Sequence, residues 1–320
     1  MEKILEVKNL SKWFTLGNNP FKQKETVRAV DDVSFHIDHR EVLGLVGESG
    51  CGKTTCGKLI LKIFEPTEGS IIFKGKDLAS MSRRDLLPYK QEMMIIYQDP
   101  FGSLDPRMPI GKAIEEPIAV HNSMPKKDRQ EWTANLMKKV GLSPDQMNRY
   151  PHEFSGGQRQ RIGIARALAT EPDFIVADEA VSALDVSIQA QIINLLQDLQ
   201  REFGLTLLFI SHDLSVIKHI SDRVVVMYLG KIAEVASKSS LFSHPKHPYT
   251  QALLSAIPIP DPKRRKEREI LMGDVPSPIN PPPGCRFHTR CPHVMDICRK
   301  EEPPLIEIEP GHSVACYLFA

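Results

Sequence analysis

Apolar and polar positions alternate near the amino terminus and give way to continuous apolar runs farther along the chain. Residues 3–10 and 27–37 alternate, which predicts two strands with one buried face each. Short uninterrupted apolar runs predict buried strands elsewhere. These runs cover residues 42–46, 71–73, 93–97, 174–177, 205–210 and 224–228.

Helical periodicity separates several of these strands. We expect helices at 56–64, with Ile63 on the apolar side, and at 187–203. A third helix is expected directly after residues 155–157 and runs through Ala169. Residues 110–148 also carry helix-like patterns, which we expect to be broken at Pro117 and at 122–125 and stopped by Gly141 before Pro144. Strands alternating with helices predict an α/β fold with a parallel sheet.

A glycine-rich stretch follows the apolar run 42–46 directly. Residues 47–55, GESGCGKTT, fit the phosphate-binding pattern G-x-x-x-x-G-K-[ST] between a predicted strand and a predicted helix. In this setting Lys53 would reach the β- and γ-phosphates of a nucleotide, and the Thr54 hydroxyl would ligate Mg²⁺. A glycine-rich turn that happens to contain lysine is the alternative, which the strand and helix context disfavours. The phosphate-binding candidates are Gly47, Ser49, Gly50, Cys51, Gly52, Lys53, Thr54 and Thr55.

Two carboxylates end a second apolar strand. Asp178 and Glu179 follow the run 174–177, and residues at the carboxyl edge of a parallel strand face the ligand crevice of an α/β sheet. Asp178 is placed to hold Mg²⁺, directly or through water, and Glu179 to polarise an attacking water. A helix-capping acidic pair is the alternative.

The segment 153–161, EFSGGQRQR, resembles the signature of ATP-binding cassette (ABC) proteins, usually Leu-Ser-Gly-Gly-Gln, with Phe154 in place of leucine. The resemblance implies the ABC ATPase core of phosphate-loop NTPases, with a RecA-like parallel sheet, an antiparallel β subdomain and a helical subdomain at about 99–165. In that family the signature loop binds the γ-phosphate held by the other subunit of a dimer. The corresponding residues here are Ser155, Gly156, Gly157 and Gln158.

Further positions match the family residue by residue. Gln98 matches the Q-loop glutamine that senses Mg²⁺ and the γ-phosphate, Asp185 belongs to the D-loop that crosses the dimer interface, and His212 matches the switch histidine. Gln98 and His212 could also be ordinary polar strand-end residues. With Lys53 and Glu179 they complete the catalytic pattern, so the resemblance implies an ATP-hydrolysing enzyme that uses Mg²⁺.

The adenine-stacking residue is left open between two neighbours. Phe14 matches the family's aromatic position, Trp13 beside it is a rival, and either could belong to the core.

Longer stretches resemble the ATP-binding subunits of oligopeptide and dipeptide importers. They are residues 97–108, 178–187 and 247–249, and the run 273–283 looks more like the F-type than the D-type subunit. The resemblance implies a heterodimer with a D-type subunit, docked on two membrane permeases and fed by an extracytoplasmic peptide-binding protein. Peptide is the expected cargo, and nickel, glutathione and antimicrobial peptides are the alternatives within the family.

These stretches also suggest how the chain is divided. We expect an ABC nucleotide-binding domain at 1–250 and an importer-type C-terminal domain at 251–320. The basic run 263–266 is interpreted as a solvated linker, with contact to anionic lipid head groups as the alternative.

Composition narrows the setting of the protein. The chain has 320 residues, 41% of them hydrophobic, and a formal net charge of +1, which shows no electrostatic signature of a nucleic-acid binder. No apolar run is long enough to span a bilayer, and the amino terminus lacks the apolar core of a signal peptide. We therefore expect a cytosolic protein with reduced thiols. The resemblance to importer subunits implies a peripheral subunit on the cytoplasmic face of the cell membrane. A soluble ABC ATPase without permeases is the rival class.

Four of the six cysteines fall in the last 36 residues: Cys285, Cys291, Cys298 and Cys316. In a reducing compartment clustered thiols suggest a metal site more than disulfides, and sets of four sulfurs suit Zn²⁺ or an iron–sulfur cluster. The lack of a C-x₂-C pair weighs against an ordinary zinc ribbon. Related importer ATPases carry a [4Fe–4S] cluster on similar cysteines, and the resemblance favours that group here; free thiols and disulfides are the alternatives.

Overall fold

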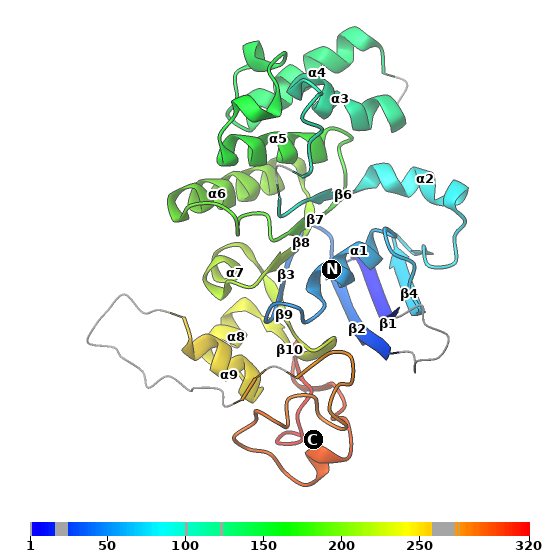
Figure 1. Ribbon diagram of the computed structural model, residues 1–320, viewed down its shortest axis with the longest axis vertical. Coiled ribbons are helices and arrows are strands. Elements are labelled where there is room, and N and C mark those ends of the chain that lie inside the picture. Colours follow the sequence, from blue (N-terminus) through cyan, green and yellow to red (C-terminus); the bar gives the residue numbers. More distant parts are fainter. Residues whose placement is uncertain (1, 17–24, 100–101, 122–123, 258–272, 275) are drawn as a thin grey trace, which may run out of the picture. The chain divides into compact units, whose positions relative to one another are not determined.

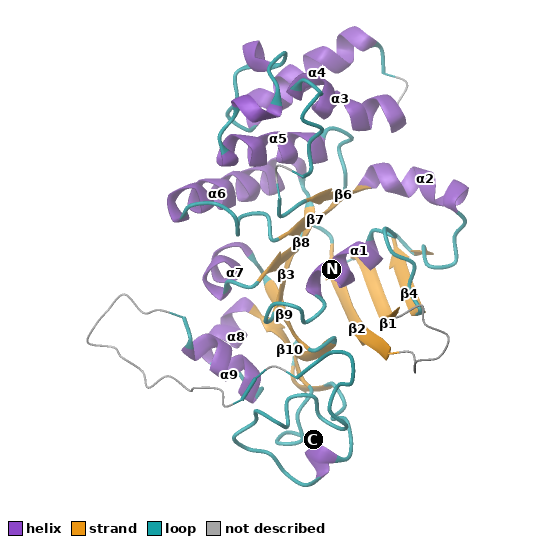
Figure 2. Ribbon diagram, viewed as in Figure 1, coloured by secondary structure: helices purple, strands orange, loops and turns teal. Residues whose placement is uncertain are grey.

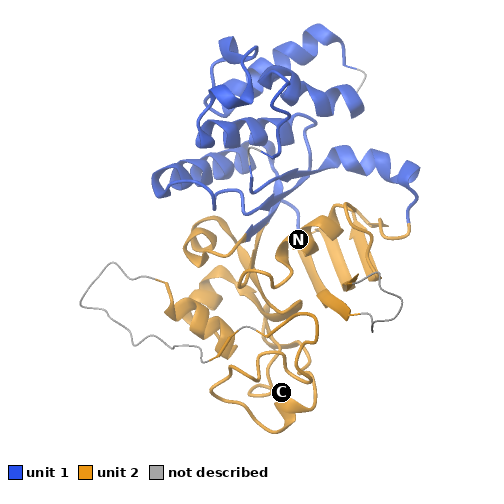
Figure 3. Ribbon diagram, viewed as in Figure 1, with its two compact units in different colours: residues 1, 38–41, 81–210 blue, residues 2–37, 42–80, 211–320 orange. Residues whose placement is uncertain are grey.

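The computed structural model describes residues 2–16, 25–99, 102–121, 124–257, 273–274 and 276–320. The basic run 263–266 lies outside these ranges. The described chain forms two compact units (Figure 3). Unit 1 contains residues 38–41 and 81–210, and unit 2 contains residues 2–37, 42–80 and 211–320.

Unit 1 is built on three parallel strands, β6 (Met93–Ile96), β7 (Phe174–Asp178) and β8 (Thr206–Ser211). β7 is the middle strand, and Phe174 pairs with Met93 on one side and Thr206 on the other. Every residue of β7 and β8 is buried, as the continuous apolar runs predicted. The carboxyl end of β7, where Asp178 lies, is therefore set in a rigid frame.

Helices make up most of the rest of unit 1 (Figure 2). Three of them, α3 (Ile110–His121), α4 (Lys126–Lys139) and α5 (Gly156–Leu168), pack on one another. The others are α2 (Arg83–Glu92), α6 (Val186–Phe203) and the short 3₁₀ turns Pro144–Gln146 and Pro151–Glu153. The carboxyl end of α5 and both ends of α6 lie within a residue of the predicted ones, and Gly204, in the left-handed region, ends α6. α5 begins at Gly156, inside the segment expected to precede it, because Ser155 caps the helix there.

Two predictions about helix limits are wrong. Pro117 does not break the third helix, which runs without interruption from Ile110 to His121, because the buried neighbours Ile114 and Ile118 hold it in place by packing. The first helix, α1 (Lys53–Ile60), begins earlier and ends sooner than expected. Lys62 adopts a left-handed φ of 50°, which turns the chain away and leaves Ile63 45% exposed.

Unit 2 contains an antiparallel sheet and a mixed one (Figure 1). The antiparallel sheet has the order β2-β1-β4-β5 and supplies the predicted β subdomain. Its strands are β1 (Lys3–Leu16), β2 (Glu25–Asp38), β4 (Glu68–Phe73) and β5 (Lys76–Asp77). The two amino-terminal strands, β1 and β2, are longer than the alternation alone predicted.

The mixed sheet of unit 2 carries the start of the phosphate loop. β3 (Val42–Val46) pairs in parallel with β9 (Arg223–Tyr228), β9 pairs antiparallel with β10 (Lys231–Ser237), and the hairpin β11–β12 continues from β10. The hairpin strands are Ile306–Glu309 and His312–Val314, and the helices of this unit besides α1 are α7 (Leu214–Ile220), α8 (Lys238–Ser243), α9 (Pro248–Ser255) and the 3₁₀ turn Ile297–Arg299. Through the β10–β12 pairing, the proline-rich C-terminal region shares the sheet and core of unit 2.

No described helix combines the length and the apolar character that a bilayer-spanning helix needs.

The predicted boundary between the two domains at residue 250 stays a prediction.

Candidate functional site

The phosphate loop connects β3 to α1 and depends on two glycines. Gly52 has a φ of 106°, and a Cβ there would lie 2.0 Å from the carbonyl oxygen of Ala29. A Cβ on Gly47 would lie 2.2 Å from the carbonyl oxygen of Met227. These distances exclude any side chain, so the motif glycines are required because neighbouring backbone approaches the loop closely.

Lys53 lies inside the loop. Its Nζ donates to the carbonyl oxygens of Gly47, at 2.8 Å, and Glu48, at 3.0 Å, and the residue is 4% exposed. Gly52 is the N-cap of α1 and has no side chain that could accept from the first N–H groups of the helix. The first turn, which includes Thr54 and Thr55, contains no acidic residue that would repel a phosphate. Backbone N–H groups, a helix amino terminus and an ammonium group thus meet in one loop, which is the arrangement that binds phosphate.

Glu48 is held by Tyr249 and Arg290, which the sequence did not connect with the phosphate loop. Its backbone N–H donates to the Tyr249 hydroxyl at 2.9 Å, and its carboxylate forms an ion pair with Arg290. Nearby, burial raises the pKa of the Cys51 thiol, while the positive charge of Lys53 opposes the shift. The one sequence signal for Arg290 was its place beside Cys291, which gives no hint of a contact with the loop.

Gln98 and Glu179 meet in unit 1. The Gln98 Nε2 donates to Glu179 Oε2 at 3.0 Å and to the Ser182 hydroxyl at 3.4 Å. Glu179 follows Asp178 at the end of β7 with a left-handed φ of 47°, and its N–H donates to the carbonyl oxygen of Ile210 at 3.0 Å. Asp178 is 5% exposed. The structure therefore brings together the predicted Q-loop glutamine and the predicted catalytic carboxylate, and adds Ser182 as a third partner.

The signature residues begin α5. Ser155 is the N-cap: its hydroxyl accepts from the Gln158 N–H at 3.3 Å, and the Gln158 side chain accepts from the Ser155 N–H at 3.0 Å. Gly157 has no room for a side chain, since a Cβ would lie 2.6 Å from a methyl group of Ile188, whereas Gly156 has more space. The loop is fixed by its own capping box. Asp185, the predicted D-loop residue, caps α6 without a side-chain hydrogen bond.

The two aromatic candidates differ in their surroundings. Phe14 packs edge-on against Phe64, with ring centroids 5.7 Å apart. The Trp13 Nε1 donates to Asp31 at 3.4 Å, and the Arg28 guanidinium lies 5.5 Å from the Trp13 ring centre. Both side chains are half-buried, and the choice between them stays a prediction.

His212 is exposed just after β8, in unit 2, and its neighbour Asp213 caps α7 by accepting from the Ser215 N–H at 2.7 Å. The switch role of His212 also stays a prediction.

The four C-terminal cysteines line one small cavity, together with His247, His288 and His293. All six cysteines fall in described residues and all are free thiols. Burial raises the pKa of Cys285 to about 11 and also raises the pKa of Cys291 and Cys316. Among the described residues, no three His, Cys, Asp or Glu side chains are arranged to hold a metal ion. The structure thus groups the cysteines but does not by itself supply the predicted metal site.

Comparisons with known proteins agree with this geometry. Residues 30–182 match the ABC transporter family, and residues 233–298 match the C-terminal region of oligopeptide/dipeptide transporters. A putative peptide import ATP-binding protein of Brucella ovis is 55% identical over 98% of this chain and 97% of its own length. The oligopeptide transport ATP-binding protein AppF of Bacillus subtilis is 52% identical over 100% of this chain and 98% of its own length.

Solved structures show the same cassette. The ATP-binding cassette MJ0796, in a dimeric post-hydrolysis state with ADP and Pi, is similar with a TM-score of 0.65 and 26% identity, over 73% of this chain and 98% of that one. The protein cbiO1 of Clostridium perfringens, part of the transporter complex cbiONQ, also has a TM-score of 0.65, with 25% identity over 76% and 92% of the two chains. The chain therefore belongs to the ABC ATPases, in the family of ATP-binding subunits of oligopeptide/dipeptide transporters.

Proposed function

We propose that this ATPase powers the import of dipeptides and oligopeptides, as one of two ATP-binding subunits under two membrane permeases. The observation that carries the proposal is the likeness to peptide import ATP-binding proteins over 98% of the chain, including the C-terminal region. The second subunit would be of D-type, an extracytoplasmic binding protein would deliver the peptide, and this chain would sit on the cytoplasmic face of the membrane.

The loop residues would bind and orient the triphosphate. Lys53 would neutralise charge on the β- and γ-phosphates, and the N–H groups of the loop and of the first turn of α1 would hold the phosphate oxygens. The oxygen donors of Thr54, Gln98 and Asp178 suit Mg²⁺, which prefers oxygen ligands, and these residues would hold it. When bound, the ion supplies positive charge that offsets the charge of the transferring phosphoryl group.

Glu179 would orient the attacking water, and the Gln98 contact supports that role. An amide that donates at 3.0 Å holds the carboxylate in one position at the end of β7, as a group that orients a water has to be held. Ser155, Gly156 and Gly157 of this chain would close over the γ-phosphate held by the second subunit, so hydrolysis would need the dimer.

The Glu179→Gln variant tests this role. Glutamine preserves the size and the Gln98 contact, so ATP binding should persist, while loss of the base should lower kcat by about 10²–10⁴-fold. Glu171→Gln is a matched control, because Glu171 is an exposed glutamate with a similar left-handed φ of 53°. Near-normal hydrolysis by Glu179→Gln in the assembled transporter would reject the role.

Transport assays separate the candidate cargoes and the rival class. Uptake of labelled dipeptides and oligopeptides into cells that depend on this subunit should fall when Lys53 is replaced by alanine. If nickel or glutathione uptake is lost instead, the transported cargo is nickel or glutathione and the family assignment stays the same. Co-purification with permeases from detergent extracts supports import, whereas association with ribosomes would favour a soluble ABC ATPase.

We also propose that Cys285, Cys291, Cys298 and Cys316 hold a [4Fe–4S] cluster. Two facts support it: the four thiols line one cavity, and the Cys285 N–H donates to the Cys298 carbonyl oxygen at 2.8 Å, which ties two of the cysteines together. A cluster bonds each thiolate to a different iron, so its ligands lie farther apart than those of a single ion such as Zn²⁺. Protein purified without oxygen should contain about four irons and four acid-labile sulfides per chain; zinc in their place, or no metal, would reject the cluster.

A further inference from the structure

The cysteine-rich segment reaches the phosphate loop through Arg290. Its Nη1 donates to Glu48 Oε2 at 2.8 Å and its Nη2 donates to Glu48 Oε1 at 3.3 Å, which is a two-point contact. The Arg290 side chain is 7% exposed and that of Glu48 is 26% exposed. A paired guanidinium in this environment holds a carboxylate in one orientation, which a water-exposed ion pair does not.

A second group from the C-terminal part of the chain holds the backbone of the same residue. The Tyr249 hydroxyl accepts from the Glu48 N–H at 2.9 Å. Tyr249 is fully buried, and its ring centre lies 4.7 Å from that of Tyr228 and 5.4 Å from that of Phe287. Glu48 is therefore held at its side chain and at its backbone by residues that are far away in the sequence.

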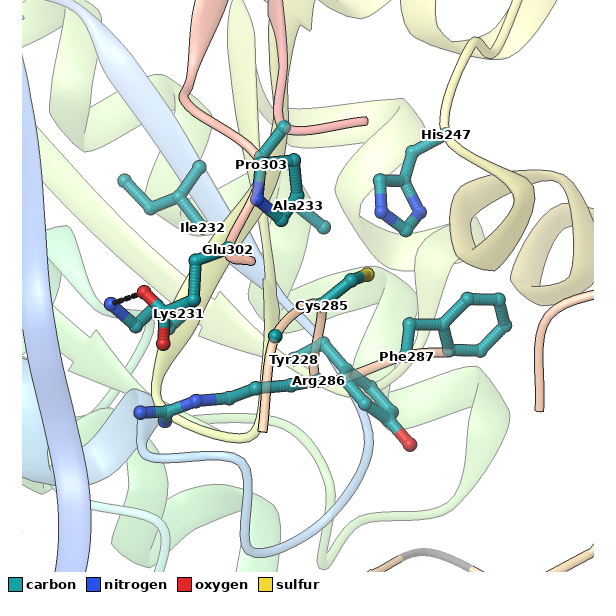
Figure 4. Close-up of a pocket in the computed structure, with 12 residues that line it drawn as sticks. Tyr228, Lys231, Ile232, Ala233, His247, Cys285, Arg286, Phe287, Glu302 and Pro303 are labelled. Carbon is teal, nitrogen blue, oxygen red and sulfur yellow. Dashed lines mark ion pairs between the residues drawn. The ribbon is translucent and has the colours of Figure 1, made fainter. Parts of the chain in front are cut away.

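The segment that carries Arg290 is itself anchored. Arg286 is buried, pairs with Asp31 and donates to the Leu229 carbonyl oxygen. Arg286 and Phe287 point in opposite directions from neighbouring positions, so that one side of the segment is fixed by charge and the other by aromatic packing (Figure 4). An anchored segment can impose a position on the loop instead of following its motion.

The position of Glu48 matters because it belongs to the wall around Lys53. The Lys53 ammonium donates to the Glu48 carbonyl oxygen at 3.0 Å, so a turn of this peptide would move both the lysine and the neighbouring N–H groups. The Glu48 carboxylate also places a negative charge in a loop that has to accept a triphosphate. Without Arg290 that negative charge would repel the triphosphate and weaken ATP binding.

We propose that Arg290 is a positioning residue of the ATP site, which neutralises Glu48 and holds the phosphate loop in the shape that accepts the triphosphate. The C-terminal region then contributes to ATP binding by holding the phosphate loop in position. Since Arg290 acts on loop shape and charge before chemistry begins, its loss should weaken ATP binding and leave the chemical step nearly intact.

The test is steady-state ATP hydrolysis by the full-length chain assembled with its partner subunits. Arg290→Gln should raise KM for ATP about tenfold, equivalent to about 1.4 kcal/mol, with kcat within about twofold of the wild type. Arg290→Lys keeps the charge but loses the two-point contact, and should raise KM by about threefold. Arg299→Gln, an exposed arginine of the same region, is the matched control and should leave both constants unchanged.

A double variant separates the effect of the uncompensated Glu48 charge from a folding defect. In Glu48→Gln/Arg290→Gln the uncompensated carboxylate is gone, so KM should return to within about threefold of the wild type. The proposal would be overturned if KM is unchanged in Arg290→Gln. It would also be overturned if kcat falls by as large a factor as KM rises. A raised KM that the double variant does not recover would assign Arg290 a structural role instead. If Arg290→Gln does not fold, Arg290→Lys still tests the two-point contact, and an unchanged KM in that variant would overturn the proposal.

Discussion

Glu234 offers a sharp test of how the C-terminal region is attached to its unit. This β10 residue is fully buried, and its carboxylate accepts from the N–H groups of Lys246 and His247 at 2.8 and 2.9 Å and contacts His312 Nε2 at 2.7 Å. Ser240 lies 2.8 Å from the other ring nitrogen of His312. One carboxylate thus joins β10, the start of α9 and the final hairpin.

Glutamine at position 234 keeps the shape but replaces one acceptor with a donor. In its better orientation the amide NH₂ faces the His247 N–H, so one hydrogen bond is lost and two donors face each other, which costs about 1–3 kcal/mol. The two remaining contacts also weaken because the charge is gone. We expect a loss of about 2 kcal/mol in the free energy of unfolding, equivalent to a fall of about 4–8 °C in Tm for a unit of this size.

Trp13 fluorescence can follow this change in a Trp132→Phe background, because Trp13 is the tryptophan of unit 2. Glu301→Gln is the matched control, since Glu301 is an exposed glutamate of the same region and should leave Tm within about 1 °C. A Glu234→Gln protein that melts with the wild type would refute the reasoning, because it would show that the three contacts contribute nothing in net terms.

Two further predictions concern pH and the phosphate loop. Burial lowers the pKa of His247 to about 4 from its ordinary 6.5, so between these values the unfolded chain binds more protons. The free energy of unfolding should therefore fall by up to about 3 kcal/mol as pH drops from 6.5 to 4, and urea titrations should find a shallower fall in His247→Asn. Gly52→Ala should abolish binding of a fluorescent ATP analogue, because a Cβ would lie 2.0 Å from the Ala29 oxygen. Gly75→Ala, at a φ of 75° with no heavy atom within 4 Å of the added Cβ, is the control and should bind normally.

Most local elements followed from the sequence. The apolar runs predicted β3, β7, β8 and β9 to within about two residues, because strands buried on both faces carry mostly apolar residues. The helix α6 was predicted to within one residue, since its apolar stripe ends where a glycine stops it. The confirmed α/β class and ABC family rest on these elements and on short motifs whose residues are set by phosphate chemistry.

Predictions that depended on a single residue's preference were less reliable. Pro117 breaks an isolated helix, yet packing on Ile114 and Ile118 holds α3 together. Ile63 fits the apolar stripe of the first helix, yet the chain turns at Lys62 and exposes it. In both places the tertiary surroundings outweighed a local tendency of about 1–3 kcal/mol.

The sequence by itself determined where phosphate chemistry is placed, because a glycine-rich loop, a lysine and a strand-end carboxylate act over a few neighbouring positions. Only the tertiary structure decided what supports them. Arg290 lies 242 residues from Glu48, and Tyr249 lies 201 residues from it. Neither contact has a signature in the local sequence, because the partners meet only after the C-terminal region has packed onto the sheet that carries the loop.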